Sequence, residues 1–194
     1  MRETAPEYIT VDYQEYLRIE EASTDVRHEL VGGVLHAMVG ASRRHNRMIM
    51  RLASLLDRAA SDGPCEVFVN EVKLRIAWDT VYYPDAMVAC DPNDDDPLVV
   101  NRPCLVIEVL SPSTSATDRR EKLLAYRTLP SLLAYLVIHQ DEQCVERHWR
   151  ETVDAPWQVA FLTDGHVPIP CPETSIALVD VYAGLPSVPS SPAS

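Results

Sequence analysis

The stretch Cys104-Leu105-Val106-Ile107-Glu108-Val109-Leu110 decides the expected fold of this chain. Six of its seven residues are apolar, which predicts a central β-strand buried on both faces. Glu108 lies inside this run, and a buried carboxylate needs a cation, a metal or strong hydrogen-bond donors as its partner. Residues 111–115, Ser-Pro-Ser-Thr-Ser, end the strand and offer N-caps for a helix over residues 115–127. An acid at this end of a central strand marks the usual place for a site in α/β proteins.

Periodicity and turn residues predict the elements that precede this strand. Residues 10–17 are expected to form a short helix with Thr10 or Asp12 as its N-cap. Gly32-Gly33 separates two short apolar runs, which predicts a β-hairpin over residues 28–38. Apolar residues at helical spacing predict the longest helix, from Arg43 to about Ala60, opened by Ser42. Three further strands are expected over residues 65–69, 72–77 and 82–90.

The elements after the helix over residues 115–127 complete a single domain. Strands are expected over residues 132–138 and 144–149, a hairpin over 157–169 around Asp164-Gly165, and a short helix over 177–182. Together these elements predict an α/β (α+β) fold with a central mixed β-sheet flanked by helices. We expect one domain over residues 1–185, followed by a Pro/Ser-rich, disordered tail over 186–194.

The composition is ordinary for a globular protein of 194 residues, with 46% apolar residues. No apolar run approaches membrane-spanning length and the first residues lack the core of a signal peptide, so we expect a cytoplasmic protein without membrane association. The net charge of -12 argues against indiscriminate binding to nucleic acid, although it leaves room for a local basic patch.

The cysteines are odd in number and include no Cys-x-x-Cys pair. Their spacing predicts neither a disulfide framework nor a zinc site. Cys90 and Cys104 lie in apolar, strand-like runs, so we expect them to be buried as small hydrophobic residues. The five positions are Cys65, Cys90, Cys104, Cys144 and Cys171.

Asp85 and Glu108 form the first candidate constellation. Asp85 follows Pro84 near the start of one predicted strand, and Glu108 lies on the expected neighbouring strand. Two such carboxylates can share Mg²⁺ and leave coordination positions for phosphate oxygens. The alternative is that Asp85 caps a turn and Glu108 forms a buried ion pair. For the pair in this setting we favour the functional interpretation. The cations available for the ion pair are Lys73, Arg75 and Lys122.

Asp118, Lys122 and Tyr126 are spaced four residues apart on the predicted helix over 115–127, so they share one edge of it. In a phosphodiesterase, Lys122 would orient the attacking water or offset the charge of the transition state. The alternative is a surface pair between Asp118 and Lys122, worth a few tenths of a kcal/mol.

The long predicted helix carries His45 in its first turn and several arginines on one side. His45 and the helix N-terminus could contact phosphate, and the basic side could contact the nucleic-acid backbone. A solvated helix face explains the same pattern equally well. The basic residues considered for nucleic-acid binding are Arg43, Arg44, Arg47 and Arg51.

Taken in order, these features resemble the Uma-type family of restriction-endonuclease-like proteins, relatives of the PD-(D/E)xK nucleases. They span roughly residues 10–183, nearly the whole chain. The resembling segments are His28-Glu29-Leu30-Val31-x-Gly33, His45, Tyr83-Pro84-Asp85, Glu108-Val-Leu-Ser-Pro-Ser113 and Asp118-x-x-x-Lys122-x-x-x-Tyr126.

The resemblance implies a restriction-endonuclease-like core and a DNA endonuclease with Mg²⁺ or Mn²⁺ held by Asp85 and Glu108. It also implies a homodimer, which cleavage of two strands would need. The strand lacks the lysine of the wider nuclease pattern, because Leu110 occupies that position. Lys122 on the next helix is similar to the relocated lysine of the Uma-type pattern. Glu29 is implied as an additional carboxylate.

Two hypotheses follow. The first is a metal-dependent endonuclease with Asp85, Glu108 and Lys122 as catalytic residues. The second is a nuclease-like binding or regulatory module with an unidentified protein partner, in which the buried acids form an ion-pair network. The net charge and the missing strand lysine favour the second. An ion pair between Glu108 and Lys122 or Arg75, without a cavity beside Asp85, would favour it further.

Overall fold

A six-stranded sheet forms the centre of the computed structural model, which describes residues 10–110 and 116–185 and leaves out the side chains of 116–118. Its strand order is β11-β10-β9-β8-β6-β3. β8 and β9 run parallel and the other neighbouring strands antiparallel, so the predicted mixed sheet is confirmed. The strands are β3 (Glu66–Val69), β6 (Ala86–Ala89), β8 (Pro103–Val109), β9 (Ala134–Ile138), β10 (Val145–Trp149) and β11 (Gln158–Leu162).

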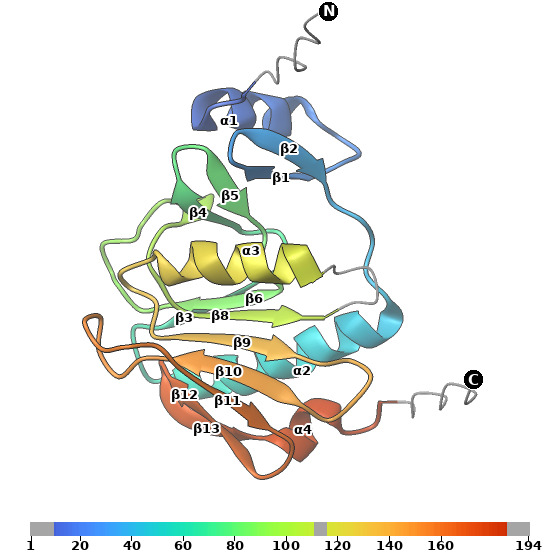
Figure 1. The fold of residues 1–194 in the computed structure, drawn as a ribbon, viewed down its shortest axis with the longest axis vertical. Helices are drawn as coiled ribbons and strands as arrows, with labels where there is room; N and C mark the ends of the chain where they lie inside the picture. Colours follow the sequence, from blue (N-terminus) through green and yellow to red (C-terminus); the bar gives the residue numbers. More distant parts are fainter. Residues whose placement is uncertain (1–9, 111–115, 186–194) are drawn as a thin grey trace, which may run out of the picture.

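Helices cover both faces of this sheet (Figure 1). Ile107 and Val109 of β8 pack in the core shared with α2 (Arg43–Ala60), whereas Val106 packs in the core shared with α3 (Ala116–Arg127). Alternate residues of one strand therefore face opposite layers. Burial on both faces explains why β8 is apolar almost throughout.

Two smaller sheets complete the fold. A five-stranded sheet has the order β2-β1-β5-β4-β7, and β12 pairs with β13 alone. No helix in the described part of the chain is long and apolar enough to cross a bilayer. The remaining elements are α1 (Tyr13–Ala22), β1 (His28–Val31), β2 (Val34–Ala37), β4 (Lys73–Ala77), β5 (Thr80–Tyr82), β7 (Val99–Val100), β12 (His166–Pro170), β13 (Glu173–Ala177) and α4 (Leu178–Tyr182).

Local signals in the first third of the chain act as predicted. Asp12, one of the two candidate caps, accepts a hydrogen bond from the Glu15 N–H, and α1 extends further than expected, to Ala22. Gly32 and Gly33 adopt φ of 55° and 81°, which join β1 and β2 in a two-residue hairpin. Ser42 caps α2.

The single strand expected over residues 82–90 is wrong, because it is two strands in two sheets. β5 pairs with β4 and β1 in the five-stranded sheet, and β6 pairs with β3 and β8 in the six-stranded sheet. Tyr83-Pro84-Asp85 crosses between the sheets. Pro84 has no N–H to donate to a ladder, which suits a crossing point.

The hairpin expected over residues 157–169 is also wrong. β11 pairs with β10, whereas β12 pairs with β13, so the turn at Asp164-Gly165 joins two sheets. β13 was not predicted, and the terminal helix is confirmed as α4. The Ser/Thr cluster over 111–115 and the tail over 186–194 lie outside the described residues.

The expectation of free cysteines is wrong for four of the five. Cys65 forms a disulfide with Cys90, and Cys104 with Cys171, at sequence separations of 25 and 67 residues. The pairing of β3 with β6 brings the first pair together, and such long-range pairing leaves no local spacing pattern. Cys144 alone among the cysteines is free, and it is buried.

Candidate active site

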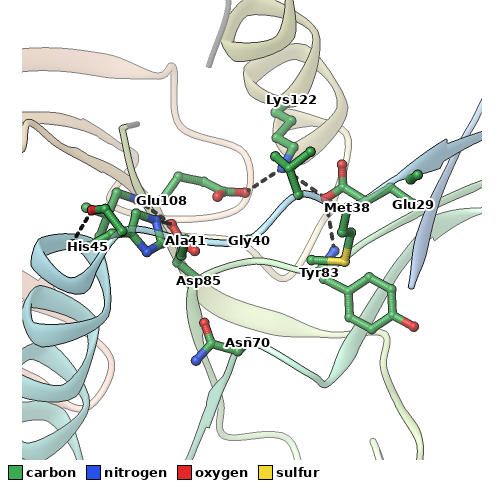
Figure 2. A pocket seen from close by; sticks show the side chains of 14 residues that line it. Glu29, Met38, Gly40, Ala41, His45, Asn70, Tyr83, Asp85, Glu108 and Lys122 are labelled. Carbon is green, nitrogen blue, oxygen red and sulfur yellow. Dashed lines mark hydrogen bonds and ion pairs between the residues drawn. The ribbon is translucent and has the colours of Figure 1, made fainter. Parts of the chain in front are cut away.

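Acidic side chains from two neighbouring strands meet at one cavity. Ala86 of β6 pairs with Ile107 of β8, so Asp85 and Glu108 occupy adjacent positions on antiparallel strands. Both line a cavity of about 450 Å³ (Figure 2). Residues from other parts of the chain complete its wall, among them Glu29, Gly40, His45, Asn70 and Lys122.

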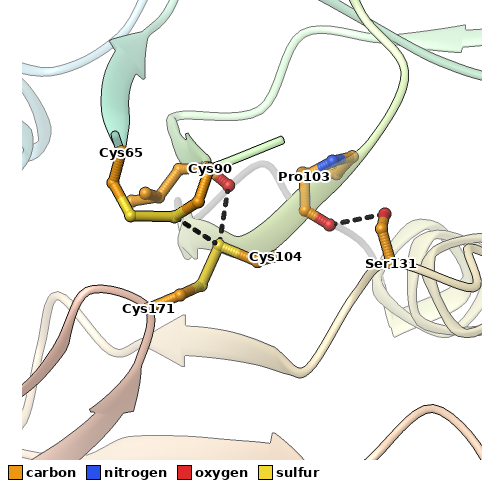
Figure 3. Close-up of a disulfide and its surroundings, with 7 residues drawn as sticks. Cys65, Cys90, Pro103, Cys104, Ser131 and Cys171 are labelled. Atoms are coloured by element: carbon orange, nitrogen blue, oxygen red, sulfur yellow. Dashed lines mark hydrogen bonds between the residues drawn. A yellow bond between two sulfur atoms is a disulfide. The ribbon is translucent and has the colours of Figure 1, made fainter. Parts of the chain in front are cut away.

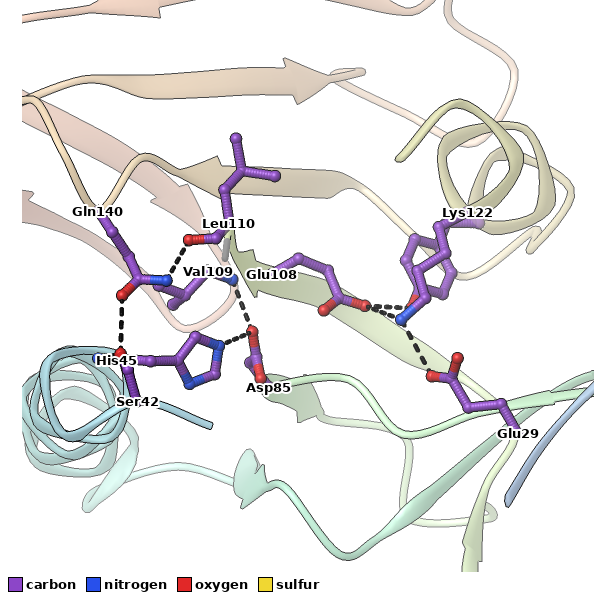
Figure 4. A network of polar contacts seen from close by, with 10 residues as sticks. Glu29, Ser42, His45, Asp85, Glu108, Val109, Leu110, Lys122 and Gln140 are labelled. Atoms are coloured by element: carbon purple, nitrogen blue, oxygen red, sulfur yellow. Dashed lines mark hydrogen bonds and ion pairs between the residues drawn. The ribbon is translucent and has the colours of Figure 1, made fainter. Parts of the chain in front are cut away.

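Two groups orient one oxygen of Asp85 (Figure 4). The backbone N–H of Val109 donates to its Oδ2 at 2.7 Å, and Nε2 of His45 lies 3.1 Å from the same atom. Burial lowers the pKa of His45, but the hydrogen bond and the negative charge of Asp85 outweigh it, so the pKa lies above its ordinary value. His45 reaches this position because Ser42 starts α2 three residues earlier.

Lys122 bridges two acids across the cavity. Its Nζ lies 3.0 Å from Oε1 of Glu29 and 3.3 Å from Oε1 of Glu108. The Tyr126 hydroxyl donates to the same Glu108 oxygen at 2.6 Å. Glu29 also accepts a hydrogen bond of 3.3 Å from the Tyr83 N–H. The ammonium of α3 therefore enters the same cavity as the carboxylates.

The environment of Glu108 disfavours its charge. Burial raises the pKa of Glu108 to about 7, and the nearby charge of Asp85 adds to the effect while Lys122 opposes it. Only 13% of the side chain is exposed. A carboxyl group with a pKa near neutrality, placed in a cavity beside a second acid, is typical of functional sites.

The donor set fits a hard divalent cation. Within the described residues, Oδ1 of Asp85 and Oε2 of Glu108 accept no hydrogen bond, although both side chains line the cavity. Carboxylate oxygens are the ligands that Mg²⁺ prefers, and Mg²⁺ usually needs only one or two of them. Glu29 does not join the pair in a three-carboxylate cluster in this part of the chain, since its near oxygen binds Lys122.

The structure contains one of the two features expected for a purely structural ion-pair network. Glu108 pairs with Lys122 and not with Lys73 or Arg75, whose charges lie over the rings of other residues. The cavity beside Asp85, however, is present. The condition that would have favoured a purely structural network, an ion pair without a cavity, is therefore not fulfilled.

Of the other predicted site residues, one contacts a carboxylate of the cavity. Tyr126 contacts Glu108 as described, whereas the side chain of Asp118 lies outside the described residues. Arg44 donates to the Gln140 carbonyl at 2.7 Å, and Arg51 donates to a carbonyl of α4 at 3.5 Å. The remaining two arginines considered for nucleic-acid binding, Arg43 and Arg47, are exposed.

One residue of the surrounding network was missed. Gln140 is 4% exposed and follows β9, where its side chain accepts a hydrogen bond from Ser42 Oγ at 3.2 Å and donates to the Leu110 carbonyl. It joins the start of α2 to the end of β8, the two segments that carry His45 and Glu108. A single glutamine after an apolar run offers no sequence signal for such a role.

A mixed sheet between two helices, with acids where β6 begins and β8 ends, defines the restriction-endonuclease-like class of folds. The chain belongs to the Uma2 family, whose model, described as "Putative restriction endonuclease", matches residues 13–179. The resemblance found in the sequence is thereby confirmed. Families of this class generally use divalent metal ions and act on DNA.

The chain is also similar to two relatives and to a solved structure. Two uncharacterized proteins of Synechocystis sp. are 37% and 32% identical, over 76% and 89% of this chain and 85% and 91% of their own lengths. The crystal structure of a putative nuclease of the DUF820 family from Anabaena variabilis has a TM-score of 0.71 at 19% identity. It covers 90% of this chain and 99% of its own. At that identity the likeness concerns the fold.

Proposed function

We propose that the chain is a metal-dependent DNA endonuclease that hydrolyses phosphodiester bonds. The observation that carries this proposal is the convergence of Asp85, Glu108 and the Lys122 ammonium on one cavity of about 450 Å³. The active unit would be a single domain over residues 1–185. Action as a homodimer, as two-strand cleavage would need, and residence in the cytoplasm are parts of the same proposal.

Asp85 and Glu108 would hold Mg²⁺ or Mn²⁺ through their unbonded oxygens. The bound ion would polarise the phosphate and lower the pKa of a water molecule. The protein's own contribution is to fix the two carboxylates, since Val109 and His45 hold Asp85 while Tyr126 holds Glu108. Such preorganisation spares reorganisation during the reaction.

Lys122 would provide positive charge at the scissile phosphate. Within the described residues, its ammonium donates hydrogen bonds to Glu29 and Glu108, which places it beside the metal-binding carboxylates. Glu29 thus acts as a positioning residue, which holds the ammonium in the cavity beside the two carboxylates. Asp118 on the same helix would be accessory. The exposed Arg43 and Arg47, together with Arg44 and Arg51, would contact the DNA backbone on the side of α2.

The test is cleavage of supercoiled, linear and single-stranded DNA with Mg²⁺ or Mn²⁺, together with calorimetric titration of Mn²⁺. Asp85→Asn should abolish both cleavage and Mn²⁺ binding, because it removes a charged ligand. Lys122→Met should lower cleavage by roughly a hundredfold or more and retain Mn²⁺ binding. Glu151→Gln, an acid-to-amide change at an exposed position, is the control and should leave both unchanged.

A second candidate, a binding or regulatory module with a protein partner, is favoured by the Glu108–Lys122 ion pair and the net charge of -12. A wild-type protein that neither cuts DNA nor binds Mn²⁺ would favour this function over the nuclease. Binding of Mn²⁺ through Asp85 without cleavage would instead leave the metal site in place and show that the substrate is not among those tried.

A further inference from the structure

Four cysteines from four separate segments gather into one cluster of sulfur atoms (Figure 3). Cys65 precedes β3, Cys90 follows β6, Cys104 lies in β8 and Cys171 follows β12. Beyond the two disulfides, Sγ of Cys90 lies 3.5 Å from Sγ of Cys104. The sulfurs of Cys90, Cys104 and Cys171 all lie within 4.8 Å of one another.

This contact between the disulfides is more than two independent cross-links require. Either disulfide would join its own pair of segments without touching the other. The sulfur of Cys104 also lies 3.3 Å from the Val88 carbonyl. A thiol can donate a hydrogen bond to that oxygen, whereas a disulfide sulfur has no hydrogen to donate. The surroundings of Cys104 therefore accommodate the reduced form as well.

A β-bulge in β8 directs the side chain of Cys104 toward the other cysteines. The register between β6 and β8 shifts between Val88 and Ala89, so that Val88 pairs with Leu105 and Ala89 with Pro103, and Cys104 is left without a partner. A bulge of this kind redirects a side chain and recurs near functional sites. Cys104 is 9% exposed and Cys171 is 8% exposed.

We propose that the four cysteines form a binding site for a soft divalent metal, with Zn²⁺ as the fitting ion, when the disulfides are reduced. Zn²⁺ binds thiolate at about 2.3 Å in tetrahedral geometry, which puts the sulfurs about 3.8 Å apart. The 3.5 Å between Sγ of Cys90 and Sγ of Cys104 is already close to this spacing, and the sulfurs of each disulfide would separate to it after reduction. Cys65, bonded to Cys90 in the oxidised form, is the fourth ligand.

The two forms of the cluster are related by a balanced reaction. Two molecules of a dithiol reductant give four electrons and four protons to the two disulfides, which yields four thiols and two molecules of oxidised dithiol. Zn²⁺ then binds the thiolates, and the coordinating thiols release their protons to solvent. In the reverse reaction, two molecules of oxidised dithiol take four electrons from the thiolates and four protons from solvent, which re-forms the two disulfides and releases Zn²⁺.

The cluster is separate from the candidate active site. Cys90 and Asp85 lie at opposite ends of β6, and Cys104 and Glu108 lie toward opposite ends of β8. At the rise of a β-strand these separations are about 13–17 Å. A metal at the cysteines would therefore be structural, joining β3, β6, β8 and the segment after β12.

The experiment uses Co²⁺ as a spectroscopic probe of the full-length protein, reduced with dithiothreitol under anaerobic conditions and then desalted. We expect thiolate-to-cobalt charge-transfer absorption that saturates at one Co²⁺ per chain and disappears when Zn²⁺ is added. The oxygen ligands of Asp85 and Glu108 cannot produce this absorption. Cys144→Ser is the matched control, since Cys144 is a buried cysteine outside the cluster, and it should bind Co²⁺ as the wild type does.

Cys90→Ser should abolish the absorption, and Cys65→Ser should weaken it while the protein keeps its circular dichroism spectrum. A folded, reduced wild type without the absorption would overturn the proposal, and so would absorption that persists in Cys90→Ser. If reduction unfolds the protein, recovery of the fold on addition of Zn²⁺ supports the site. Failure of Zn²⁺ to restore the fold overturns it.

Discussion

Replacement of Glu108 by glutamine should change how the stability of the metal-free protein depends on pH. The Glu108 carboxyl is 13% exposed, and burial raises its pKa to about 7. Glutamine has nearly the same shape and cannot ionise. Because Lys122 also contacts Glu29 at 3.0 Å, its ammonium still has a negatively charged partner in the variant.

The sign of the effect follows from proton linkage. The folded protein binds the Glu108 proton more tightly than the unfolded chain, whose glutamate pKa is 4.5. The stabilisation that comes from protonated Glu108 is therefore fully present below about pH 4.5, and it falls as the pH rises toward 7. The two pKa values correspond to about 3 kcal/mol of unfolding free energy. Between pH 5 and 8, we expect Glu108→Gln to gain about 2–3 kcal/mol relative to wild type.

Urea unfolding in EDTA, followed by tryptophan fluorescence at pH 5 and pH 8, measures this gain. The same change at the exposed Glu151 gives the baseline for loss of an unburied carboxylate. Addition of Mn²⁺ at pH 8 should stabilise the wild type and not Glu108→Gln, because a ligand that binds only the folded state raises stability. A difference between wild type and Glu108→Gln that is the same at both pH values would refute the reasoning.

Three further predictions test other parts of the structure. Tyr126→Phe removes the 2.6 Å hydrogen bond to Glu108 and should cost about 1–3 kcal/mol in urea unfolding at pH 8, where that carboxylate is ionised. Gly33→Ala should destabilise the protein more than Gly32→Ala. Both glycines have positive φ, but a Cβ at Gly33 would lie 3.0 Å from another side chain, whereas a Cβ at Gly32 would meet open space. Equal melting temperatures of the two variants would contradict this. Leu105→Ala, at a fully buried position, should cost about 2–5 kcal/mol in the same unfolding assay, and a loss below 1 kcal/mol would speak against a packed core there.

Local signals explain the part of the fold that was predicted correctly. The apolar run of β8, the Gly32-Gly33 turn and the Ser42 cap each act through neighbouring residues alone. Adjacency of Asp85 and Glu108 was also expected, since the two acids were placed on neighbouring strands, and the pairing of Ala86 with Ile107 confirms it. That the Lys122 ammonium enters the cavity depends on how α3 packs, which sequence spacing does not determine.

The errors share one physical cause, the choice of a distant partner. Apart from Pro84 and Asp85, residues 82–90 have strand-forming composition, yet they are divided between two sheets at Pro84. The hairpin predicted around Gly165 fails because β11 and β12 find partners elsewhere. The disulfides likewise depend on strand pairing and not on spacing along the chain.

The bulge at Cys104 restricts which changes in chain length this family can tolerate. Deletion of one residue between Cys104 and Glu108 would shift one part of β8 by one position relative to the other. Side chains in the shifted part that now face α2 would then face α3, and the reverse. The same deletion would either turn Glu108 away from Lys122 or turn Cys104 away from the other three cysteines of the cluster. We expect insertions and deletions among relatives to fall in the exposed acidic loop over residues 91–98, and the length of β8 to stay constant.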